Sequence, residues 1–318
     1  MYDDRVELTL QLARDAHSRI ADSINRTPVF TSETIDKLAG VRVYFKCENF
    51  QKSGAFKARG ATNAVLQLSA DQAASGVVTH SSGNHAAALS RAAKLRGIPA
   101  HIVMPENSSK AKIASVRRYG GVITFCEPTL EARESVARSV MEETGATFIH
   151  PYDDLRVMAG QGTAALELIE QISQLDTLIC PVGGGGLLSG CALVAKSLLP
   201  DIKVVAAEPA LADDAHRSFE AGHIIPSLSP TTIADGLLTS LGDKTFPIIQ
   251  RCVDDVMTVS DEAIRSSMRL IWEVLKIIVE PSAAVGLATI LENGTNGLRR
   301  NVAIILTGGN VDLDNLPW

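Results

Sequence analysis

One lysine, Lys57, stands where an amine could take part in chemistry. It follows Phe56, between an apolar run at residues 41–45 that predicts a strand and an apolar-periodic stretch at 61–68 that predicts a helix. A lysine at such a hinge can project its amine into a cleft, where it suits an imine with an aldehyde cofactor. Taken alone, Lys57 is better explained as a solvated lysine at a helix start, because most lysines lie on the surface. Its interpretation therefore depends on the other motifs of the chain.

Four consecutive glycines, Gly183, Gly184, Gly185 and Gly186, form a second motif. They follow an apolar run at 177–182 that predicts a strand, and they precede a predicted helix. Glycines let the backbone curl so that several N–H groups point inward, and the helix N-terminus adds partial positive charge; both favour a bound phosphate. A structural turn is the alternative, but four glycines in a row carry a large entropy penalty. The run therefore predicts a phosphate site.

The glycine run does not fit two common nucleotide motifs. A dinucleotide-binding G-x-G-x-x-G that began at Gly183 would end at Leu188, and one that began at Gly184 would end at Ser189. No Gly-Lys-Ser/Thr follows, which excludes a P-loop. A nicotinamide-dependent oxidoreductase is therefore the weaker interpretation, although Glu208 ends the next predicted strand where such a fold keeps its ribose-binding acid.

Two further polar motifs also follow predicted strands. Ser81-Ser82-Gly83-Asn84-His85 comes after the run at 76–79 and opens a predicted helix, and Thr307-Gly308-Gly309-Asn310 comes after the run at 302–306. Hydroxyls and free N–H groups at a helix start bind a carboxylate well, although ordinary N-capping by Ser82 or Asn84 is common. Thr307 by itself would be no more than the end of a strand.

Taken in their order along the chain, these motifs resemble those of the serine racemase and serine/threonine dehydratase family, which includes the threo-3-hydroxyaspartate dehydratases. Its members are pyridoxal phosphate (PLP) enzymes with the fold of the tryptophan synthase β-subunit. The resemblance runs from Thr27-Pro28-Val29 to Gly309-Asn310-Val311-Asp312, nearly the whole chain. It implies an α/β fold of two domains, with parallel-rich twisted sheets flanked by helices. Residues 1–68 and 155–318 would form a large cofactor-binding domain, and 76–152 a small mobile substrate domain inserted within it.

The resemblance also implies roles for the motif residues. Lys57 and Ser82 would be catalytic groups on opposite faces of the substrate α-carbon, which is what racemisation requires. Asn84 would touch the phenolic oxygen of the cofactor, and the hydroxyl of Thr307 would meet its pyridine nitrogen. A hydroxyl does not hold that nitrogen protonated, so expulsion of a β-leaving group becomes easier than a long-lived carbanion. Phe56 and the glycine run would complete the cofactor site.

Substrate binding would fall to the loop after residue 80 and to one arginine. Arg133, on the helix predicted at 130–143, would reach the distal carboxylate of a dicarboxylic substrate; a solvated arginine is an equal alternative. Ala86-Ala87 stands where mammalian-type racemases have the Gly-Gln of their nucleotide effector site, which argues against nucleotide activation. The substrate-binding residues implied in the loop are Ser81, Ser82, Asn84 and His85, and His85 is given no catalytic role.

An acidic loop resembles the divalent-cation site of the same family. In Glu208-Pro209-Ala210-Leu211-Ala212-Asp213-Asp214 the matching groups are Glu208, the main-chain carbonyl of Ala212, and Asp214. Two carboxylates and a carbonyl suit a hard cation such as Mg²⁺, Mn²⁺ or Ca²⁺ that keeps several waters. The alternative is a helix N-terminus decorated with acids, which is common. Such a cation would be structural or activating, away from the chemistry.

Composition narrows the class of protein. Of 318 residues, 46% are apolar, which is ample for a buried core. The net charge of −6 and the lack of a long Lys/Arg cluster argue against nucleic-acid binding. No apolar run reaches the roughly 18 residues of a membrane helix, and residues 1–5 show no basic leader. Five cysteines without a C-x-x-C pair are expected to be reduced and buried, as in a cytoplasmic protein.

The elements that must position these motifs alternate along the chain. An amphipathic helix is predicted at 6–22, and short apolar runs then alternate with longer helical stretches. This alternation predicts parallel sheets with helices on both faces, whose sites lie beyond the carboxyl ends of the strands. The predicted strands are 41–45, 76–79, 100–104, 122–125, 177–182, 203–207, 256–259 and 302–306, and the helices between them are 84–96, 109–119, 130–143, 159–172, 187–199 and 261–272.

The sequence favours a PLP-dependent ammonia-lyase that removes water and ammonia from serine, threonine or 3-hydroxyaspartate and leaves a 2-oxo acid. In this hypothesis Lys57 takes the α-proton and the cofactor phosphate helps the β-hydroxyl to leave. Racemisation of serine, with Ser82 reprotonating the other face, is the closest alternative. A non-catalytic binding protein is disfavoured because Lys57 and Ser82 occur together. A homodimer is expected from the resemblance.

Overall fold

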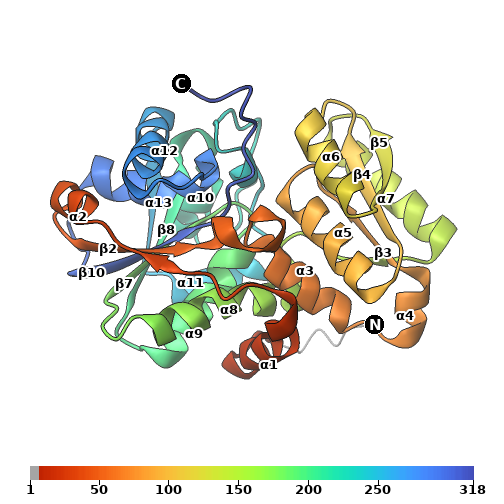
Figure 1. Ribbon diagram of the computed structural model, residues 1–318, viewed down its shortest axis with the longest axis horizontal. Coiled ribbons are helices and arrows are strands. Elements are labelled where there is room, and N and C mark those ends of the chain that lie inside the picture. Colours follow the sequence, from red (N-terminus) through yellow and green to blue (C-terminus); the bar gives the residue numbers. More distant parts are fainter. Residues whose placement is uncertain (1–6) are drawn as a thin grey trace.

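Two parallel-rich sheets make up the computed structural model of the chain, which describes residues 7–318 (Figure 1). The larger sheet has the strand order β1-β2-β10-β7-β8-β9, and the smaller sheet has the order β5-β4-β3-β6. In Figure 1 the smaller sheet lies on the right, in orange and yellow, with its helices around it. This is the α/β fold that the sequence predicts. Val6, which the predicted N-terminal helix included, lies outside the described residues.

All neighbouring strands run parallel except β1, which lies antiparallel to β2 at the edge of the larger sheet. Parallel strands covered on both faces appear in the sequence as continuous apolar runs, because both sides are buried. In β10, every residue from 302 to 306 is buried. The strands are β1 (Val29–Phe30), β2 (Arg42–Cys47), β3 (Val77–His80), β4 (Ala100–Pro105), β5 (Val122–Cys126), β6 (Thr147–Phe148), β7 (Thr177–Pro181), β8 (Lys203–Pro209), β9 (Asp255–Val259) and β10 (Asn301–Leu306).

Helices cover both faces of each sheet. One face of the larger sheet packs against α1, α8, α9 and α11, and the other against α2, α12 and α13. The smaller sheet packs against α3, α5 and α6 on one face and α7 on the other. The helices are α1 (Leu10–Ile20), α2 (Glu33–Ala39), α3 (Lys57–Leu66), α4 (Ala70–Ser75), α5 (Asn84–Arg96), α6 (Lys110–Arg118), α7 (Leu130–Thr144), α8 (Leu155–Gln171), α9 (Gly186–Leu198), α10 (Asp214–Ala221), α11 (Thr245–Cys252), α12 (Asp261–Leu275) and α13 (Pro281–Asn293).

Every predicted strand is confirmed, with small shifts at its ends. The helix predicted at 61–68 begins four residues earlier, so that Lys57 is its first residue, and α8 likewise begins before its predicted start. The two-residue strands β1 and β6 are too short to leave a pattern in the sequence. Helix α13 was not predicted because residues 282–290 are all buried, so it has no polar face to mark a helical period. None of the helices in the described part of the chain is long and apolar enough to cross a membrane.

Helices α3 and α8 cross at a pair of glycines. A Cβ on Gly60 would lie 2.7 Å from the carbonyl oxygen of Val157, and a Cβ on Gly160 would lie 2.6 Å from the Cα of Gly60. The amide of Gly60 also donates a hydrogen bond to the side-chain oxygen of Gln161 (3.0 Å). Only glycine permits this approach, which sets the first turn of α3 directly against α8.

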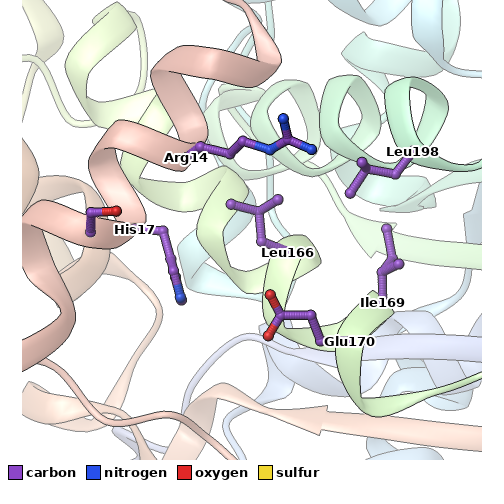
Figure 2. A pocket seen from close by; sticks show the side chains of 7 residues that line it. Arg14, His17, Leu166, Ile169, Glu170 and Leu198 are labelled. Atoms are coloured by element: carbon purple, nitrogen blue, oxygen red, sulfur yellow. The ribbon is translucent and has the colours of Figure 1, made fainter.

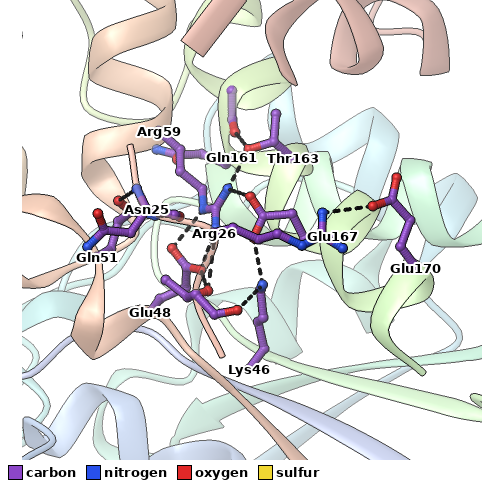
Figure 3. Close-up of polar contacts among 12 residues, drawn as sticks. Asn25, Arg26, Lys46, Glu48, Gln51, Arg59, Gln161, Thr163, Glu167 and Glu170 are labelled. Atoms are coloured by element: carbon purple, nitrogen blue, oxygen red, sulfur yellow. Dashed lines mark hydrogen bonds and ion pairs between the residues drawn. The ribbon is translucent and has the colours of Figure 1, made fainter. Parts of the chain in front are cut away.

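Four charged side chains lie buried where the end of β2, α3 and α8 meet (Figure 3). Arg59 donates to both carboxylate oxygens of Glu48 (2.8 Å each) and to both of Glu167 (2.7 and 2.8 Å). Lys46 donates to Glu167 as well (2.6 Å). Burial by itself would lower the pKa of Arg59, but the carboxylates of Glu48 and Glu167 raise it above its usual value. We call these four residues the ion cluster; its two positive and two negative charges neutralise one another away from water.

Loss of one charge from the ion cluster should be strongly destabilising. Arg59→Met leaves two buried carboxylates opposed only by Lys46, so we expect the free energy of unfolding to fall by about 3–5 kcal/mol, measured by urea denaturation. Arg26→Ala, which removes an exposed ion pair, is the control and should change that free energy by less than about 1 kcal/mol. Equal losses in the two variants would contradict the stabilising role assigned to the ion cluster.

Candidate active site

The segment that carries Lys57 lies against the segment that follows β10. The amide of Phe56 donates to the carbonyl oxygen of Thr307 (3.0 Å), and the amide of Gly309 donates to the carbonyl oxygen of Gly54 (2.9 Å). Because β10 is an inner strand of the larger sheet, these bonds place the start of α3 at the carboxyl edge of that sheet. This is the edge at which α/β proteins bind their ligands.

The amine of Lys57 is held in a desolvated position. It donates to the carbonyl oxygen of Pro151 (2.6 Å) and lies 5.1 Å from the centroid of the Phe56 ring. Burial lowers the pKa of Lys57 from its usual value to about 8. An amine with this pKa is partly neutral near physiological pH, so it can act as a nucleophile and a base where an exposed lysine cannot.

The side-chain amide of Asn84 is fixed on both sides. Its Nδ2 donates to Oε1 of Glu280 (2.7 Å), and its Oδ1 accepts from Nδ2 of Asn310 (2.8 Å). Asn310 also donates to the carbonyl oxygen of Ser53 (2.8 Å). Burial raises the pKa of Glu280 to about 8, so this acid is mostly protonated and uncharged at neutral pH. These bonds join three of the four predicted motifs at one place.

The glycine loop, residues 183–186, connects β7 to α9. Its amides at 184–186 have no acceptor among the described residues. Side chains hold the loop from two sides, because a Cβ on Gly184 would lie 2.4 Å from the ring of Tyr152 and a Cβ on Gly185 would lie 2.9 Å from Thr245. The hydroxyl of Thr245 donates to the carbonyl oxygen of Gly184 (2.9 Å). Free amides at the N-terminus of a 13-residue helix form a ready anion site.

The predicted residues of the loop after β3 differ in their surroundings. Ser81 and Ser82 are half-buried, and the hydroxyl of Ser82 makes no hydrogen bond within residues 7–318. His85 is buried, and its Nε2 lies 3.3 Å from the carbonyl oxygen of Ile149. Burial is the main cause that lowers the pKa of His85 well below its usual value, so the ring is neutral. The structure thus places His85 as a support for the start of α5, and its contact with substrate stays a prediction.

Arg133 lies in the first turn of α7, where its Nε donates to the carbonyl oxygen of Thr129 (3.2 Å). The pKa of His80, the last residue of β3, is lowered chiefly by burial and next by the positive charge of Arg133. Arg133 therefore lies near the strand end that leads into the Ser81–Ser82 segment. It forms no ion pair in the part of the chain that the structure describes.

The acidic loop after β8 contains two buried carboxylates. Glu208 accepts hydrogen bonds from the amides of Ala215 and His216 (2.8 Å each), at the start of α10. Burial raises the pKa of Glu208 to about 8 and that of Asp214 to about 6. Ala212 lies between them, in the short turn Ala210–Ala212. Across residues 7–318 no group of three or more His, Cys, Asp or Glu side chains could hold a metal ion, so a cation here remains a prediction.

Two contacts of this site involve residues that the sequence did not single out. Glu280 precedes Pro281, so it looks like an ordinary acid at a helix start, and nothing in the sequence marks it as buried. Tyr152 follows the two-residue strand β6, and its ring packs on the glycine loop. The signal available for Tyr152 was its rarity, because the chain has only 4 tyrosines.

A surface cavity of about 480 Å³ lies between α1, α8 and α9 (Figure 2). Figure 2 shows that Arg14 and His17 reach it from α1, whereas Leu166 and Glu170 belong to α8. None of the predicted site residues lines it. The residues that line it are Arg14, His17, Ser18, Leu166, Ile169, Glu170 and Leu198.

Residues 20–308 match the family described as "Pyridoxal-phosphate dependent enzyme". The chain belongs to this family. It is 55% identical over 303 residues to the beta-hydroxyaspartate dehydratase of Paracoccus denitrificans (strain Pd 1222), covering 95% of this chain and 96% of that protein. It is 53% identical over 308 residues to the serine racemase of Arabidopsis thaliana, covering 95% and 93%. The structure of maize serine racemase superposes with a TM-score of 0.96 at 49% identity, covering 97% of this chain and 95% of that one.

Membership in the PLP-dependent family confirms the family and fold expected from the motifs, and it excludes the oxidoreductase interpretation. The residues present fit the cofactor. The hydroxyl of Thr307 is buried with no hydrogen-bond partner among the described residues, which is unfavourable unless another group pairs with it. The glycine loop offers free amides for a phosphate, and the amine of Lys57 is desolvated as an aldehyde-binding lysine requires.

Lys57 should be the point of cofactor attachment. Treatment of the PLP-loaded protein with borohydride should fix the cofactor to a peptide that contains Phe56 and Lys57, detected by mass spectrometry. Because only a neutral amine attacks an aldehyde, the rate at which PLP attaches to the cofactor-free protein should rise with pH through about 8.

Lys52→Ala is the control for this test, since Lys52 is an exposed lysine of the same segment. It should leave attachment and its pH dependence unchanged, whereas Lys57→Ala should abolish both attachment and turnover. A borohydride-stable adduct on Lys57→Ala would contradict the assignment.

Proposed function

We propose that the chain is a PLP-dependent ammonia-lyase that eliminates water and ammonia from a small 3-hydroxy amino acid and leaves a 2-oxo acid. The observation that carries this proposal is a desolvated Lys57, joined by backbone hydrogen bonds to a segment that presents the free, buried hydroxyl of Thr307. The candidate substrates are serine, threonine and 3-hydroxyaspartate. Similarity to a beta-hydroxyaspartate dehydratase and to serine racemases supports this substrate class. Racemisation of serine is the second candidate, favoured by the free hydroxyl of Ser82.

When bound, PLP supplies an electron sink that makes the α-proton of an amino acid acidic. Lys57 is the base that removes this proton: its amine makes one neutral contact, to Pro151, and desolvation leaves it partly unprotonated near neutral pH. The glycine loop would hold the cofactor phosphate. Asn84 uses one of its amide hydrogens on Glu280, which leaves the other for the cofactor's phenolic oxygen.

The hydroxyl of Thr307 bears on the partition between elimination and racemisation. If it pairs with the pyridine nitrogen, this hydroxyl would not hold that nitrogen protonated as a carboxylate would, which would favour loss of the β-hydroxyl over racemisation. The buried acid nearby, Glu280, is bonded to Asn84 instead. This arrangement supports the lyase as the main activity.

Ser82 should matter for racemisation far more than for elimination. Only racemisation needs a proton donor on the face of the α-carbon opposite Lys57, so Ser82→Ala should sharply lower the rate at which L-serine becomes D-serine and change the rate of pyruvate formation little. Ammonia release and enantiomer analysis, run on serine, threonine and 3-hydroxyaspartate, would measure both. Equal losses would mean that Ser82 only binds the substrate carboxylate, and absence of ammonia from all three substrates would contradict the lyase itself.

Arg133 should select for a dicarboxylic substrate. A second carboxylate inside a cleft is unfavourable unless it is paired, and a guanidinium can pair with it through two parallel hydrogen bonds. Arg133→Ala should therefore lower kcat/KM for 3-hydroxyaspartate about ten- to a hundredfold, with a much smaller change for serine and threonine. Arg138→Ala, an exposed arginine of the same helix, is the control. Equal loss on all three substrates would indicate a structural role for Arg133.

We further propose a divalent cation, Mg²⁺, Mn²⁺ or Ca²⁺, at Glu208, the carbonyl of Ala212 and Asp214. In support, both carboxylates are buried and neither forms an ion pair with a described residue. The negative charge of Asp214 also adds to the rise in the pKa of Glu208. A cation would remove this repulsion and join the acidic loop to α10.

Chelation should lower the melting temperature, and Mg²⁺, Mn²⁺ or Ca²⁺ should restore it. A ligand that binds only the folded state stabilises it by about 2.7 kcal/mol at a hundredfold excess over Kd. Glu208→Gln should abolish the response to EDTA, whereas Glu220→Gln, which changes an exposed acid of α10, should keep it. A wild-type protein that does not respond to EDTA would leave Glu208 as a cap of α10.

The proposal also includes closure of residues 76–152 over the substrate and assembly as a cytoplasmic homodimer. An exposed ion pair between Lys112 of α6 and Asp235 (2.5 Å) links the smaller sheet to the larger one, and such a pair is weak enough to open.

For the homodimer, the exposed side chains of Phe50 and Ile278 supply apolar surface for a second copy. Asn49, the neighbour of Phe50, donates a hydrogen bond to the carbonyl oxygen of Ile278, so the two segments lie close together. All five cysteines are buried and unpaired, which suits a reducing compartment.

A further inference from the structure

The ring of His150 is locked in one tautomer by the main chain. Its Nδ1 accepts hydrogen bonds from the backbone amides of Asp153 (2.8 Å) and Tyr152 (3.3 Å). A nitrogen that accepts carries no proton, so the proton of the neutral ring lies on Nε2. Burial is the main cause that lowers the pKa of His150 to about 3. His150 is therefore a neutral ring that presents one fixed N–H donor.

This donor belongs to the surroundings of the reactive amine. Pro151, the next residue along the chain, accepts the hydrogen bond of the Lys57 amine, and the charge of Lys57 contributes to the low pKa of His150. The ring of His80, whose pKa reports the nearby charge of Arg133, lies edge-on at 6.1 Å from that of His150. The Nε2–H of His150 has no acceptor within residues 7–318, and this nitrogen is not fully buried.

We propose that His150 is a specificity-determining residue whose Nε2–H, together with the guanidinium of Arg133, binds the distal carboxylate of a 3-hydroxy dicarboxylic amino acid. The inference rests on the proposed function and narrows its substrate class. A carboxylate has two oxygens to satisfy, and the guanidinium of Arg133, which forms no ion pair with a described residue, can supply the charged partner. The second donor is neutral, so it adds a hydrogen bond without a charge that would repel Lys57. Serine has no group for this donor to bind.

A neutral donor of this kind also keeps the roles of the site apart. Because Nδ1 is occupied by two main-chain amides, His150 cannot take the α-proton without breaking them, so the base remains Lys57. A neutral histidine with a free ring nitrogen at the same place would compete for that proton. The lock on Nδ1 thus assigns His150 to recognition and leaves the proton chemistry to the lysine.

Two substitutions separate the donor from the structural lock. In His150→Asn the side-chain oxygen takes the place of Nδ1 and accepts the same two amides, but no donor remains at Nε2. The expected result is a kcat/KM about tenfold lower for 3-hydroxyaspartate and changed less than about twofold for serine. Titration of the PLP-loaded protein with succinate, followed by cofactor absorbance, should show about tenfold weaker binding, with butyrate unaffected.

His150→Gln is the matched variant, because its amide nitrogen lies near the position of Nε2. It should keep the preference for 3-hydroxyaspartate over serine within about threefold, and it remains informative if the Asn variant does not fold. Equal loss on both substrates in His150→Asn, unchanged succinate affinity, or loss of the preference in a folded Gln variant would each overturn the proposal. A wild-type protein that turns over neither substrate contradicts the proposed lyase instead, and the succinate titration then still tests His150.

Discussion

The ion cluster around Arg59 fixes where the amine of Lys57 can lie. Arg59 and Lys57 are two residues apart in the first turn of α3, so their side chains leave the helix in different directions. With the guanidinium held by carboxylates on two other elements, the turn cannot rotate or slide without exposing a buried charge to an apolar core. A buried pair adds little net stability over an apolar replacement, but losing one partner is strongly unfavourable. The arrangement that pairs all four charges is therefore the populated one, and it aims Lys57 at the carboxyl edge of the larger sheet.

Burial favours the uncharged forms of the titratable groups at the candidate site, whereas the charges of the ion cluster are paired with one another. It lowers the pKa of Lys57 and of His150, and it raises that of Glu280, so each group shifts towards its uncharged form. The buried charges of the ion cluster are paired with one another, and Arg156 is paired with Asp154. Around Lys57 the candidate site contributes mainly dipoles: the amides of the glycine loop and the amide of Asn84. In the proposed function, charge would enter with the ligands, whose phosphate and carboxylates would meet donors in a place where little water competes.

The sequence predicted the sheets because buried parallel strands are continuous apolar runs, and it led to the candidate site because each motif directly follows such a run. It could not predict contacts that depend on distant segments. Lys46 and Glu167 are partners across 121 positions of sequence, and Glu280 reaches Asn84 across 196. Lys46, Glu167 and Glu280 look like ordinary surface residues until the fold buries them. The tautomer of His150 was equally hidden, because it is set by backbone amides whose direction only the turn after β6 determines.

That turn, residues 150–154, is where the smaller sheet is joined to the chemistry of the larger one. Pro151 accepts from the amine of Lys57, and Tyr152 packs on the glycine loop. Asp153 accepts from the amides of Lys244 and Thr245, where α11 begins. Asp154 caps α8. Hydrogen bonds and packing contacts on the side of the larger sheet therefore hold this turn in place. In the proposed closure these contacts would end the moving part before residue 150 rather than at 152, so His150 and the carbonyl of Pro151 would stay with Lys57 while Arg133 and the Ser81–Ser82 segment approach or recede. Recognition of the distal end of a substrate would then combine one fixed donor and one mobile cation, and only a substrate that bridges the two would favour closure.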